Sequence, residues 1–290
     1  MLVSRSTLAH LRFVFSIFLL PVYLFALSQV QGTTYFRATI IFLVWYVLAI
    51  PATNGYNSYF DKDEGSIALL AKPPAVDKGL YYVSVLMEVL AFLLGLLISV
   101  WFAFAVLIYG IMSKLYSHPA TRLKKYPVIS FLTVFFFQGA FMYWAIYGGL
   151  AGPIVFFLGW NPEILIAGGI CSCLIGASYP LTQIYQHEED SKRGDHTLSL
   201  LLGYRGSFIF SGIMFGIGII LSFFYWHSMQ QIGNFYFFLG CSFPIFLFFN
   251  YWFFRVIKEA SAANYKNAMR MNFISAAFML LYFGWLAFVR

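Results

Sequence analysis

The chain has 290 residues, of which 61% are hydrophobic and only 10% are charged, and its mean hydropathy is +0.78. Since charged residues make up about a quarter of an ordinary soluble domain, this composition excludes that class of protein. The formal net charge of +7 does not indicate nucleic-acid binding, because the basic residues lie between apolar runs, where they indicate membrane topology instead.

Apolar runs of about 17–25 residues, long enough to cross a bilayer as a helix, recur along the whole sequence. In lipid every backbone polar group must be hydrogen-bonded internally, which favours helices over sheet for runs of this length. We therefore predict an all-α, polytopic membrane protein, and a single domain over residues 1–290 because no polar linker interrupts the pattern. The nine predicted spans are 11–30, 36–58, 79–97, 99–114, 127–148, 163–185, 207–226, 234–257 and 270–288.

The first run follows Arg5 and Arg12, as the apolar part of a signal peptide would. Residues 13–30 are too long for such a part, and the rest of the chain is equally hydrophobic, so we interpret them as the first membrane helix. Pro21 and Pro51 lie inside the first two spans and are expected to kink or locally unwind them.

Further along, residues 79–114 contain no strong polar break, and we expect a tight turn near Ser99 to separate the third and fourth spans. Glu88 is a lone acid within the third span. It is either a base at an acceptor site or an acid satisfied by a neighbouring hydroxyl or lysine.

The three cysteines, Cys171, Cys173 and Cys241, are expected to be buried small hydrophobes rather than a disulfide or a metal site.

The distribution of basic residues sets the orientation. With the N-terminus inside, 16 of the 18 Lys and Arg residues fall in or beside the inner loops, and only Arg37 and Arg290 lie outside. The positive-inside rule then predicts a cytoplasmic N-terminus. We expect an integral protein of the bacterial inner (plasma) membrane.

Acidic residues gather in two windows on this same inner side. Seven of the 11 lie either after the second span or after the sixth. Charge near lipid is costly and is usually retained for function, so we predict that the two windows face one another across a cavity and bind a divalent metal. The acids are Asp61, Asp63 and Glu64 in the first window and Glu188, Glu189, Asp190 and Asp195 in the second.

Spacing and ligand type indicate magnesium. Asn57 and Asp61 are four residues apart and project from one face of a continuing helix, and Gln186 and Asp190 repeat that spacing. Oxygen ligands suit magnesium, which typically binds one or two carboxylates together with substrate phosphates. His187 has no second histidine or cysteine pair at zinc-site spacing, which argues against zinc. The predicted metal ligands are Asn57, Asp61, Asp63, Glu64, Gln186, Glu188, Asp190 and Asp195.

A basic window, Lys114–Tyr126, follows the fourth predicted span on the same side, and it is either a solvated inner loop that only sets topology or an anion-binding segment. Arginine and lysine there would bind diphosphate oxygens, arginine bidentately and lysine as a point charge. Metal and cations together would stabilise negative charge on a leaving diphosphate. The residues expected to bind substrate are Asn57, Tyr116, Arg122, Lys124 and Arg193, and those expected to be catalytic are Asp61 and Asp190.

These residues carry a resemblance to a known family. The segment from Asn57 to Asp61 resembles the first aspartate-rich motif (Asn-Asp-x-x-Asp-x-x-x-Asp) of the UbiA superfamily of intramembrane polyprenyl transferases. The second window, with Gly194, Thr197 and Leu198 after it, resembles that family's Asp-x-x-x-Asp and Gly-x-x-Thr-Leu motif. The resemblance covers most of the chain and implies a bundle of nine transmembrane helices around a cavity open to the bilayer. It also implies that a magnesium-bound allylic diphosphate ionises and that its carbocation alkylates a hydrophobic acceptor.

The sequence departs from the family pattern at three positions. Ser58 and Gly65 stand where the first motif has aspartate, and Gln186 replaces the opening aspartate of the second. Asp63, Glu64, Glu188 and Asp195 are candidates for supplying the missing charge. A terpene cyclase, in which the chain's own double bond attacks the cation, is therefore the alternative to a transferase. A secondary transporter is less favoured, because its site would lie near the midplane between repeated halves.

Overall fold

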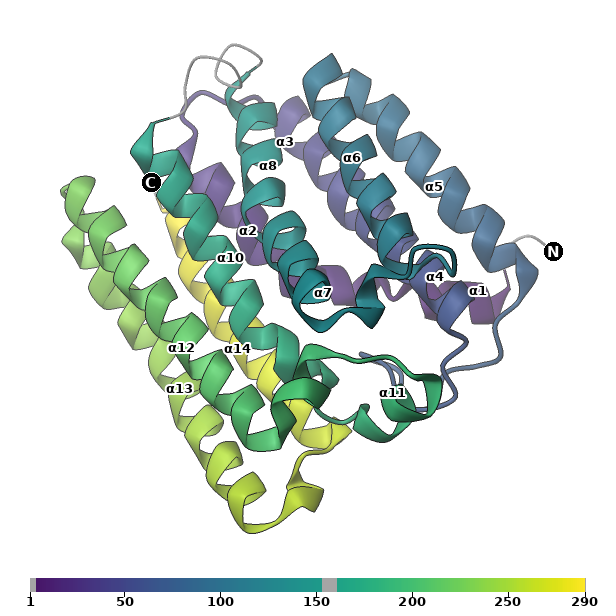
Figure 1. Ribbon diagram of the computed structural model, residues 1–290. Coiled ribbons are helices and arrows are strands. Elements are labelled where there is room, and N and C mark those ends of the chain that lie inside the picture. Colours follow the sequence, from purple (N-terminus) through teal and green to yellow (C-terminus); the bar gives the residue numbers. More distant parts are fainter. Residues whose placement is uncertain (1–3, 153–160, 290) are drawn as a thin grey trace. The chain divides into compact units, whose positions relative to one another are not determined.

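The computed structural model describes residues 4–152 and 161–289, and the side chain of Arg193 is also outside the described part (Figure 1). The described residues are almost entirely helical and form no β-strand. The helices are α1 (Arg5–Leu11), α2 (Ser16–Gln29), α3 (Tyr35–Phe42), α4 (Ile50–Asp61), α5 (Lys78–Leu96), α6 (Val100–Ser117), α7 (Pro127–Val134), α8 (Met142–Ala151), α10 (Pro162–Gln183), α11 (His187–Arg193), α12 (Leu198–Ser228), α13 (Ile232–Lys258) and α14 (Tyr265–Phe288).

The predicted all-α membrane fold is confirmed. Within the described residues, nine helical stretches are long and apolar enough to cross a membrane. Three of these stretches each consist of several consecutive helical elements, namely Arg5–Gln29, Tyr35–Asp61 and Pro127–Ala151. The other six are α5, α6, α10, α12, α13 and α14. The chain is therefore an integral membrane protein.

The expected turn near Ser99 is also present. Ser99 is the N-cap of α6, and its side chain accepts a hydrogen bond from the amide of Phe102. The seventh span begins at Leu198 rather than at the predicted residue 207. Gly203, with φ 67° and ψ 178°, interrupts its first turns. Glycine adopts this backbone conformation readily. In the sequence, Gly203 and the charged Arg205 resemble loop residues, so the prediction began the span after them.

The two prolines behave differently. Helix α2 continues through Pro21 without interruption. Pro51 lies in the first turn of α4, directly after a π-helical segment, Leu43–Ala49. Because proline has no N–H to donate, a wider turn before it accommodates the missing hydrogen bond. The predicted local unwinding is therefore found at Pro51.

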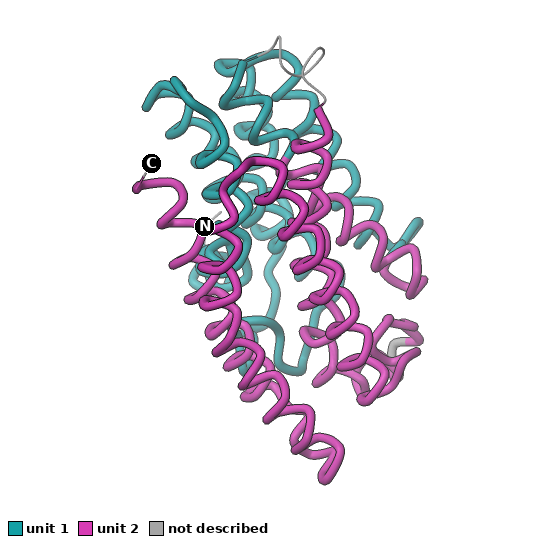
Figure 2. The backbone as a smooth tube through the Cα atoms, turned by 90° about the vertical axis from the view of Figure 1, so that its left-hand side faces the viewer, with its two compact units in different colours: residues 1–123, 144–160 teal, residues 124–143, 161–290 magenta. Residues whose placement is uncertain are grey.

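The chain divides into two compact units, shown in Figure 2. Unit 1 comprises residues 1–123 and 144–160, and unit 2 comprises residues 124–143 and 161–290. All three cysteines belong to unit 2 and are free and buried, as predicted.

In unit 1, α5 packs against α4 and α6, with α1 beside α4 and α5. Leu11, Ala52, Leu80 and Met87 form part of a buried apolar cluster between these helices. Polar contacts also anchor α1: the hydroxyl groups of Ser4 and Thr7 donate hydrogen bonds to Asp77, which caps α5 through the amide of Leu80. Because α4, α5 and α6 pack against one another, the last turn of α4 lies beside the start of α5 and the end of α6.

In unit 2, α10 packs against α12, α7 and the π-helical segment Phe135–Phe141. A Cβ atom on Gly139 would lie 2.4 Å from the Cα atom of Ser172, so only glycine permits this approach of the two backbones. The hydroxyl group of Ser172 donates to the carbonyl of Phe135 and accepts from the amide of Ala140. These bonds satisfy backbone groups that the π-helical turn leaves unpaired.

Candidate functional site

The first acidic window lies where α4 ends. The helix continues through Asp61 and stops at Lys62, which has the left-handed conformation (φ 48°) and donates its amide to the carbonyl of Ser58. Asn57 and Asp61 are therefore on one face of one helix, as their spacing predicts. Asp63 and Glu64 follow in the loop, with Asp63 half-buried and Glu64 exposed.

Both polar groups of α4 are held from α6 and the loop after it. The amide oxygen of Asn57 accepts a hydrogen bond of 3.0 Å from the hydroxyl of Ser117. One turn further along α4, the carboxylate of Asp61 lies 4.0 Å from the guanidinium of Arg122, and its side chain is only 6% exposed. The pair brings together a predicted metal ligand and a predicted diphosphate-binding residue within unit 1.

The basic loop after α6 has a defined conformation. The amides of His118 and Arg122 donate to the carbonyls of Lys114 and His118, and the Thr121 hydroxyl donates to the carbonyl of Leu115. Arg122 has φ 39°, an uncommon conformation for a residue other than glycine. Tyr116 lies in the last turn of α6, partly buried. The loop geometry directs the Arg122 guanidinium to the end of α4.

The question of Glu88 is answered in unit 1. Its carboxylate forms an ion pair with the ammonium group of Lys114 on α6. Of the two readings of this acid, the structure therefore shows the one in which a neighbouring lysine satisfies it.

The second acidic window begins where α10 ends at Gln183. Gln186 precedes the short helix α11, which ends at Gly194 in the left-handed conformation (φ 71°). This turn brings the amide of Asp195 back to the carbonyl of Asp190, at 3.0 Å. Both carboxylates are buried, at 9% and 3% relative exposure.

Two further side chains complete this cluster in unit 2. The hydroxyl of Thr197 donates to the Oδ2 atom of Asp190 at 3.1 Å, and it also caps α12 by accepting from the amide of Leu200. The ammonium of Lys124 lies 3.8 Å from the Oδ2 atom of Asp195, with its side chain 13% exposed. Thus Asp190, Asp195 and Lys124, all predicted site residues, belong to one buried group.

Glu188 lies apart from this group. Its side chain is 85% exposed and pairs with Lys192, one turn along α11, at 2.7 Å. The hydrogen bond from Lys192 and the charge of that lysine lower the pKa of Glu188. Gln186 is partly buried immediately before α11. The side chain of Arg193, predicted to bind substrate, lies outside the described part of the structure.

His187 has a role that the sequence did not indicate. Its ring stacks on Tyr204, with centroids 4.7 Å apart and planes 6° apart, and its Nε2 atom is 2.8 Å from the hydroxyl of Ser199. Burial lowers the pKa of His187. The amide of Ser199 in turn donates to the side chain of Gln183. His187 therefore joins α11 to the interrupted start of α12.

The donor atoms of both clusters fit magnesium. They are carboxylate and amide oxygens, the ligands that this ion prefers, and within the described residues no three His, Cys, Asp or Glu side chains gather into a complete metal site. Magnesium usually takes only one or two protein carboxylates and completes its shell with water and substrate phosphate. Asn57 and Asp61 in unit 1, and Asp190 and Asp195 in unit 2, could hold such an ion.

Aromatic residues predicted near the first window are packed together in unit 1. Tyr56 is 3% exposed, and its ring contacts Phe60 (4.9 Å between centroids) and Tyr81 (6.0 Å). Tyr59 contacts Phe60 and Tyr81 as well. The ring of Tyr179 in unit 2 contacts Phe131. Sequence alone could not separate these contacting rings from the many lipid-facing ones.

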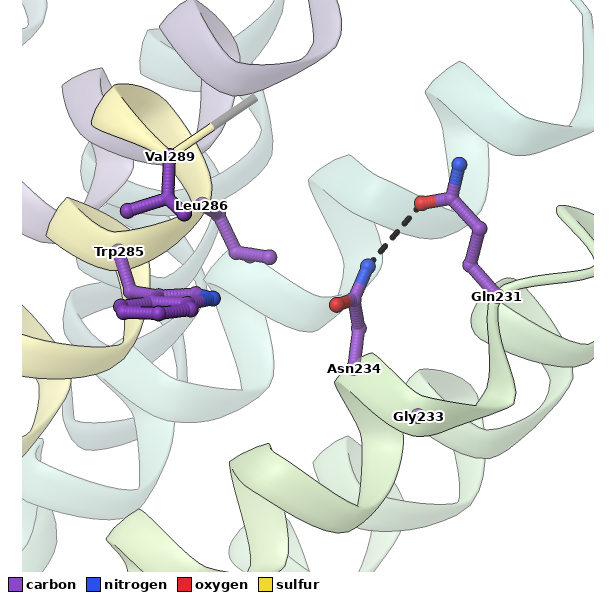
Figure 3. Close-up of a pocket in the computed structure, with 6 residues that line it drawn as sticks. All are labelled: Gln231, Gly233, Asn234, Trp285, Leu286 and Val289. Carbon is purple, nitrogen blue, oxygen red and sulfur yellow. Dashed lines mark hydrogen bonds between the residues drawn. The ribbon is translucent and has the colours of Figure 1, made fainter.

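A cavity of about 310 Å³ lies in unit 2 between the start of α13 and the end of α14. Figure 3 shows the side chains of Asn234 and Gln231 hydrogen-bonded to one another and Trp285 facing them from α14. The cavity adjoins the far end of α12, whose 31 residues separate it from Thr197 by about 45 Å of helix. It is therefore distinct from the acidic cluster of unit 2.

Residues 18–288 match the model of the UbiA prenyltransferase family. No curated protein is significantly similar in sequence. The fold resembles that of a UbiA homologue from Archaeoglobus fulgidus solved with DMAPP and Mg²⁺, with a TM-score of 0.70, 17% identity, and 98% of this chain and 100% of that chain covered.

Two further solved structures have the same fold. One is a digeranylgeranylglyceryl phosphate synthase, with a TM-score of 0.62, 19% identity and 99% of both chains covered. The other is the apo form of a UbiA homologue from Aeropyrum pernix K1, with a TM-score of 0.66, 17% identity, and 93% of this chain and 98% of that chain covered. The family model spans nearly the whole sequence, including both acidic windows. The chain thus belongs to the UbiA prenyltransferase family of membrane enzymes.

Proposed function

We propose that the protein is a magnesium-dependent prenyltransferase that ionises an allylic polyprenyl diphosphate and transfers the prenyl group to a lipid-soluble acceptor. The observation that carries the proposal is the pairing of Asp61 with Arg122 beside Asn57, at the position of the family's first motif. The A. fulgidus homologue was solved with DMAPP and with GPP, each together with Mg²⁺, which supports the same class of donor for this chain.

Each unit holds oxygen ligands and one cation of the kinds that this reaction requires. Asn57 and Asp61 supply oxygen ligands, as do Asp190 and Asp195, while Arg122 and Lys124 supply cations for diphosphate oxygens. Each cation lies close to a carboxylate, so the carboxylates hold the cations in position for the anion. Bound magnesium would neutralise charge on the diphosphate and make it a better leaving group.

The chemistry of the step sets what the residues must do. The bond between C1 of the prenyl chain and the diphosphate oxygen breaks, and its electron pair leaves with the diphosphate. The acceptor then forms a bond to C1 and loses a proton. Arg122 and Lys124 stabilise the charge that builds on the leaving oxygens, and the partly exposed rings of Tyr59 and Phe60 near the end of α4 are suited to stabilising the cation.

A terpene cyclase remains the second candidate, and one observation favours it. Gln186 supplies a neutral amide where the family's second motif begins with a carboxylate. In a cyclase the same ionisation would occur, and a double bond of the chain itself would form the new bond to C1. The two candidates therefore share the site and differ in the product.

We also place the protein in a bacterial inner membrane with a cytoplasmic N-terminus, on the basis of its 16 basic residues in or beside inner loops. The acidic loops would then meet donor and magnesium supplied from the cytoplasm.

Incubation of purified protein with magnesium and a series of allylic diphosphates, with and without membrane lipid extract, tests the proposal. A transferase releases diphosphate and yields a prenylated product only when an acceptor is present. A cyclase releases diphosphate and yields a cyclic hydrocarbon without one. Absence of diphosphate release with every donor, in protein that is folded, would contradict both.

A further inference from the structure

An ion pair links helices α5 and α6 of unit 1. Glu88 is ten residues into α5, or about 15 Å along the helix from its start, and its partner Lys114 is in the last turn of α6. A lysine near the end of a membrane helix ordinarily extends its ammonium group toward water. Lys114 instead directs it back along α6 to an acid on the neighbouring helix.

This ammonium lies beside the first motif. Its Nζ atom is 5.4 Å from the centroid of the Tyr56 ring, and Tyr56 is the residue before Asn57. Ser117, one turn after Lys114 on α6, donates its hydrogen bond to Asn57. Lys114, Ser117 and the loop residue Arg122 thus contact successive positions along the last two turns of α4.

The two partners of the ion pair differ in accessibility. The Glu88 side chain is 13% exposed and that of Lys114 is 34% exposed. The Oε1 atom of Glu88 is buried and has no hydrogen-bond partner among the described residues. The carboxylate is therefore the more enclosed partner, and the Lys114 side chain, whose ammonium group has three N–H donors, is the more accessible one.

Electrostatics explains why the acid is needed. A lysine ammonium surrounded by apolar helices is costly unless an opposite charge is near. Glu88 supplies that charge and, through Oε2, fixes the position of the ammonium. The pair is neutral as a whole, and its positive end is the one next to the Tyr56 ring.

We propose that Lys114 is a further binding residue for the diphosphate of the prenyl donor, and that Glu88 is the positioning residue that holds its ammonium group there. The inference rests on the proposed function, since it assumes that the anion binds beside Asn57 and Asp61. A donor diphosphate that is bound there meets Lys114 on the membrane side of Asn57 and Arg122 at the end of α4. Cations on both sides of the leaving group would hold it in one orientation.

Direct binding of an unreactive donor tests this inference. The affinities of purified wild type, Lys114→Met and Lys114→Arg are measured for geranyl thiodiphosphate with magnesium, and for geraniol, which lacks the diphosphate. Lys114→Met should weaken thiodiphosphate binding about tenfold or more, because a charge-assisted contact is lost. Lys114→Arg should retain most of the affinity, and geraniol should bind all three proteins equally.

A matched double variant separates binding from packing. Lys114→Met alone leaves the Glu88 carboxylate buried and unpaired, whereas Glu88→Gln together with Lys114→Met removes both charges. If the pair only held α5 to α6, the double variant would recover wild-type affinity. We expect it to bind as weakly as Lys114→Met, and we expect Glu88→Gln to weaken binding only while Lys114 is present.

The outcomes distinguish the two proposals. Wild-type protein that binds no thiodiphosphate would contradict the proposed function itself. If wild type binds thiodiphosphate and either Lys114→Met or the double variant binds it with the same affinity, the role of Lys114 is contradicted while the proposed function stands. A loss of geraniol binding as large as the loss of thiodiphosphate binding would likewise overturn the assignment to the diphosphate.

Discussion

The Oδ2 atom of Asp195 lies 3.8 Å from the Nζ atom of Lys124, and both side chains are largely enclosed. Gly194 makes this possible, since its left-handed backbone turns the chain back so that the amide of Asp195 reaches the carbonyl of Asp190. Glu188, by contrast, is exposed and paired with Lys192. Of the two nearby acids able to replace the missing motif carboxylate, Asp195 is the one that shares surroundings with Asp190.

We therefore expect Asp195→Asn to weaken the apparent affinity for magnesium more than Glu188→Gln does. The first substitution removes a buried negative charge next to Asp190, and the second removes one that water already screens. Magnesium titrations of both variants in one diphosphate-release assay measure the difference. Equal effects, or a larger effect of Glu188→Gln, would show that the exposed acid is the ligand.

Gln186→Asp should be tolerated. Gln186 lies four residues before Asp190, at the position where the family has the first aspartate of its second motif, so the substitution restores a carboxylate at a spacing that already fits. We expect activity within a few-fold of wild type and an unchanged or higher magnesium affinity. An inactive but folded Gln186→Asp protein would mean that the site requires a neutral group there, which would favour the cyclase.

Single cysteines introduced into a variant without the native three test the topology. Lys72→Cys, Ala120→Cys and Ser191→Cys, all at exposed positions, should react with an impermeant thiol reagent only from the cytoplasmic side. Gln31→Cys and Gln231→Cys should react only from the opposite side. The result follows from the positive-inside distribution of basic residues. Labelling of Lys72→Cys and Ser191→Cys from different sides would rule out the shared function of the two acidic windows.

The anchor of α1 should depend on pH through Asp77. Hydrogen bonds from Ser4, from the amide of Leu80 and from Thr7 lower the pKa of Asp77 below its ordinary value of 3.8, although burial opposes them. A depressed pKa means that the stabilisation is present above pH 3.8 and is lost as the pH falls through the lower, folded-state value. We expect wild type to melt at a higher temperature than Asp77→Asn above pH 3.8, and this difference to shrink at lower pH. A difference that stays constant down to pH 3 would exclude the carboxylate as its source.

Most of the fold could be predicted from the sequence, because a chain that crosses the bilayer needs long apolar runs and because such runs can satisfy their backbone hydrogen bonds in lipid almost only as helices. The exceptions are local. α1 was missed because it is held by hydrogen bonds to Asp77, about 70 residues away, and the start of α12 was missed because Gly203 and Arg205 look like loop residues. Neither distant hydrogen bonds nor the conformation of one glycine can be read from hydropathy.

Only the part of the site that depends on local helix geometry could be predicted from the sequence. The four-residue spacing of Asn57 and Asp61 depends only on helix geometry, and α4 confirms it. The partners of these residues depend on tertiary structure, so Ser117 and the lysine next to Glu88 emerged only from the packing of α6 on α4 and α5. The roles of the predicted ligands remain predictions.

Magnesium-dependent release of diphosphate by Asp61→Ala and Asp190→Ala tests the central claim most directly. With membrane lipid extract as the source of acceptor, purified wild type should release diphosphate from an allylic donor only when magnesium is present. Each variant, folded as judged by its melting temperature, should lose roughly 100-fold or more of that rate, because a charged ligand of the leaving group's metal is absent. Release at the wild-type rate by either variant, or by wild type after removal of magnesium, would contradict the account.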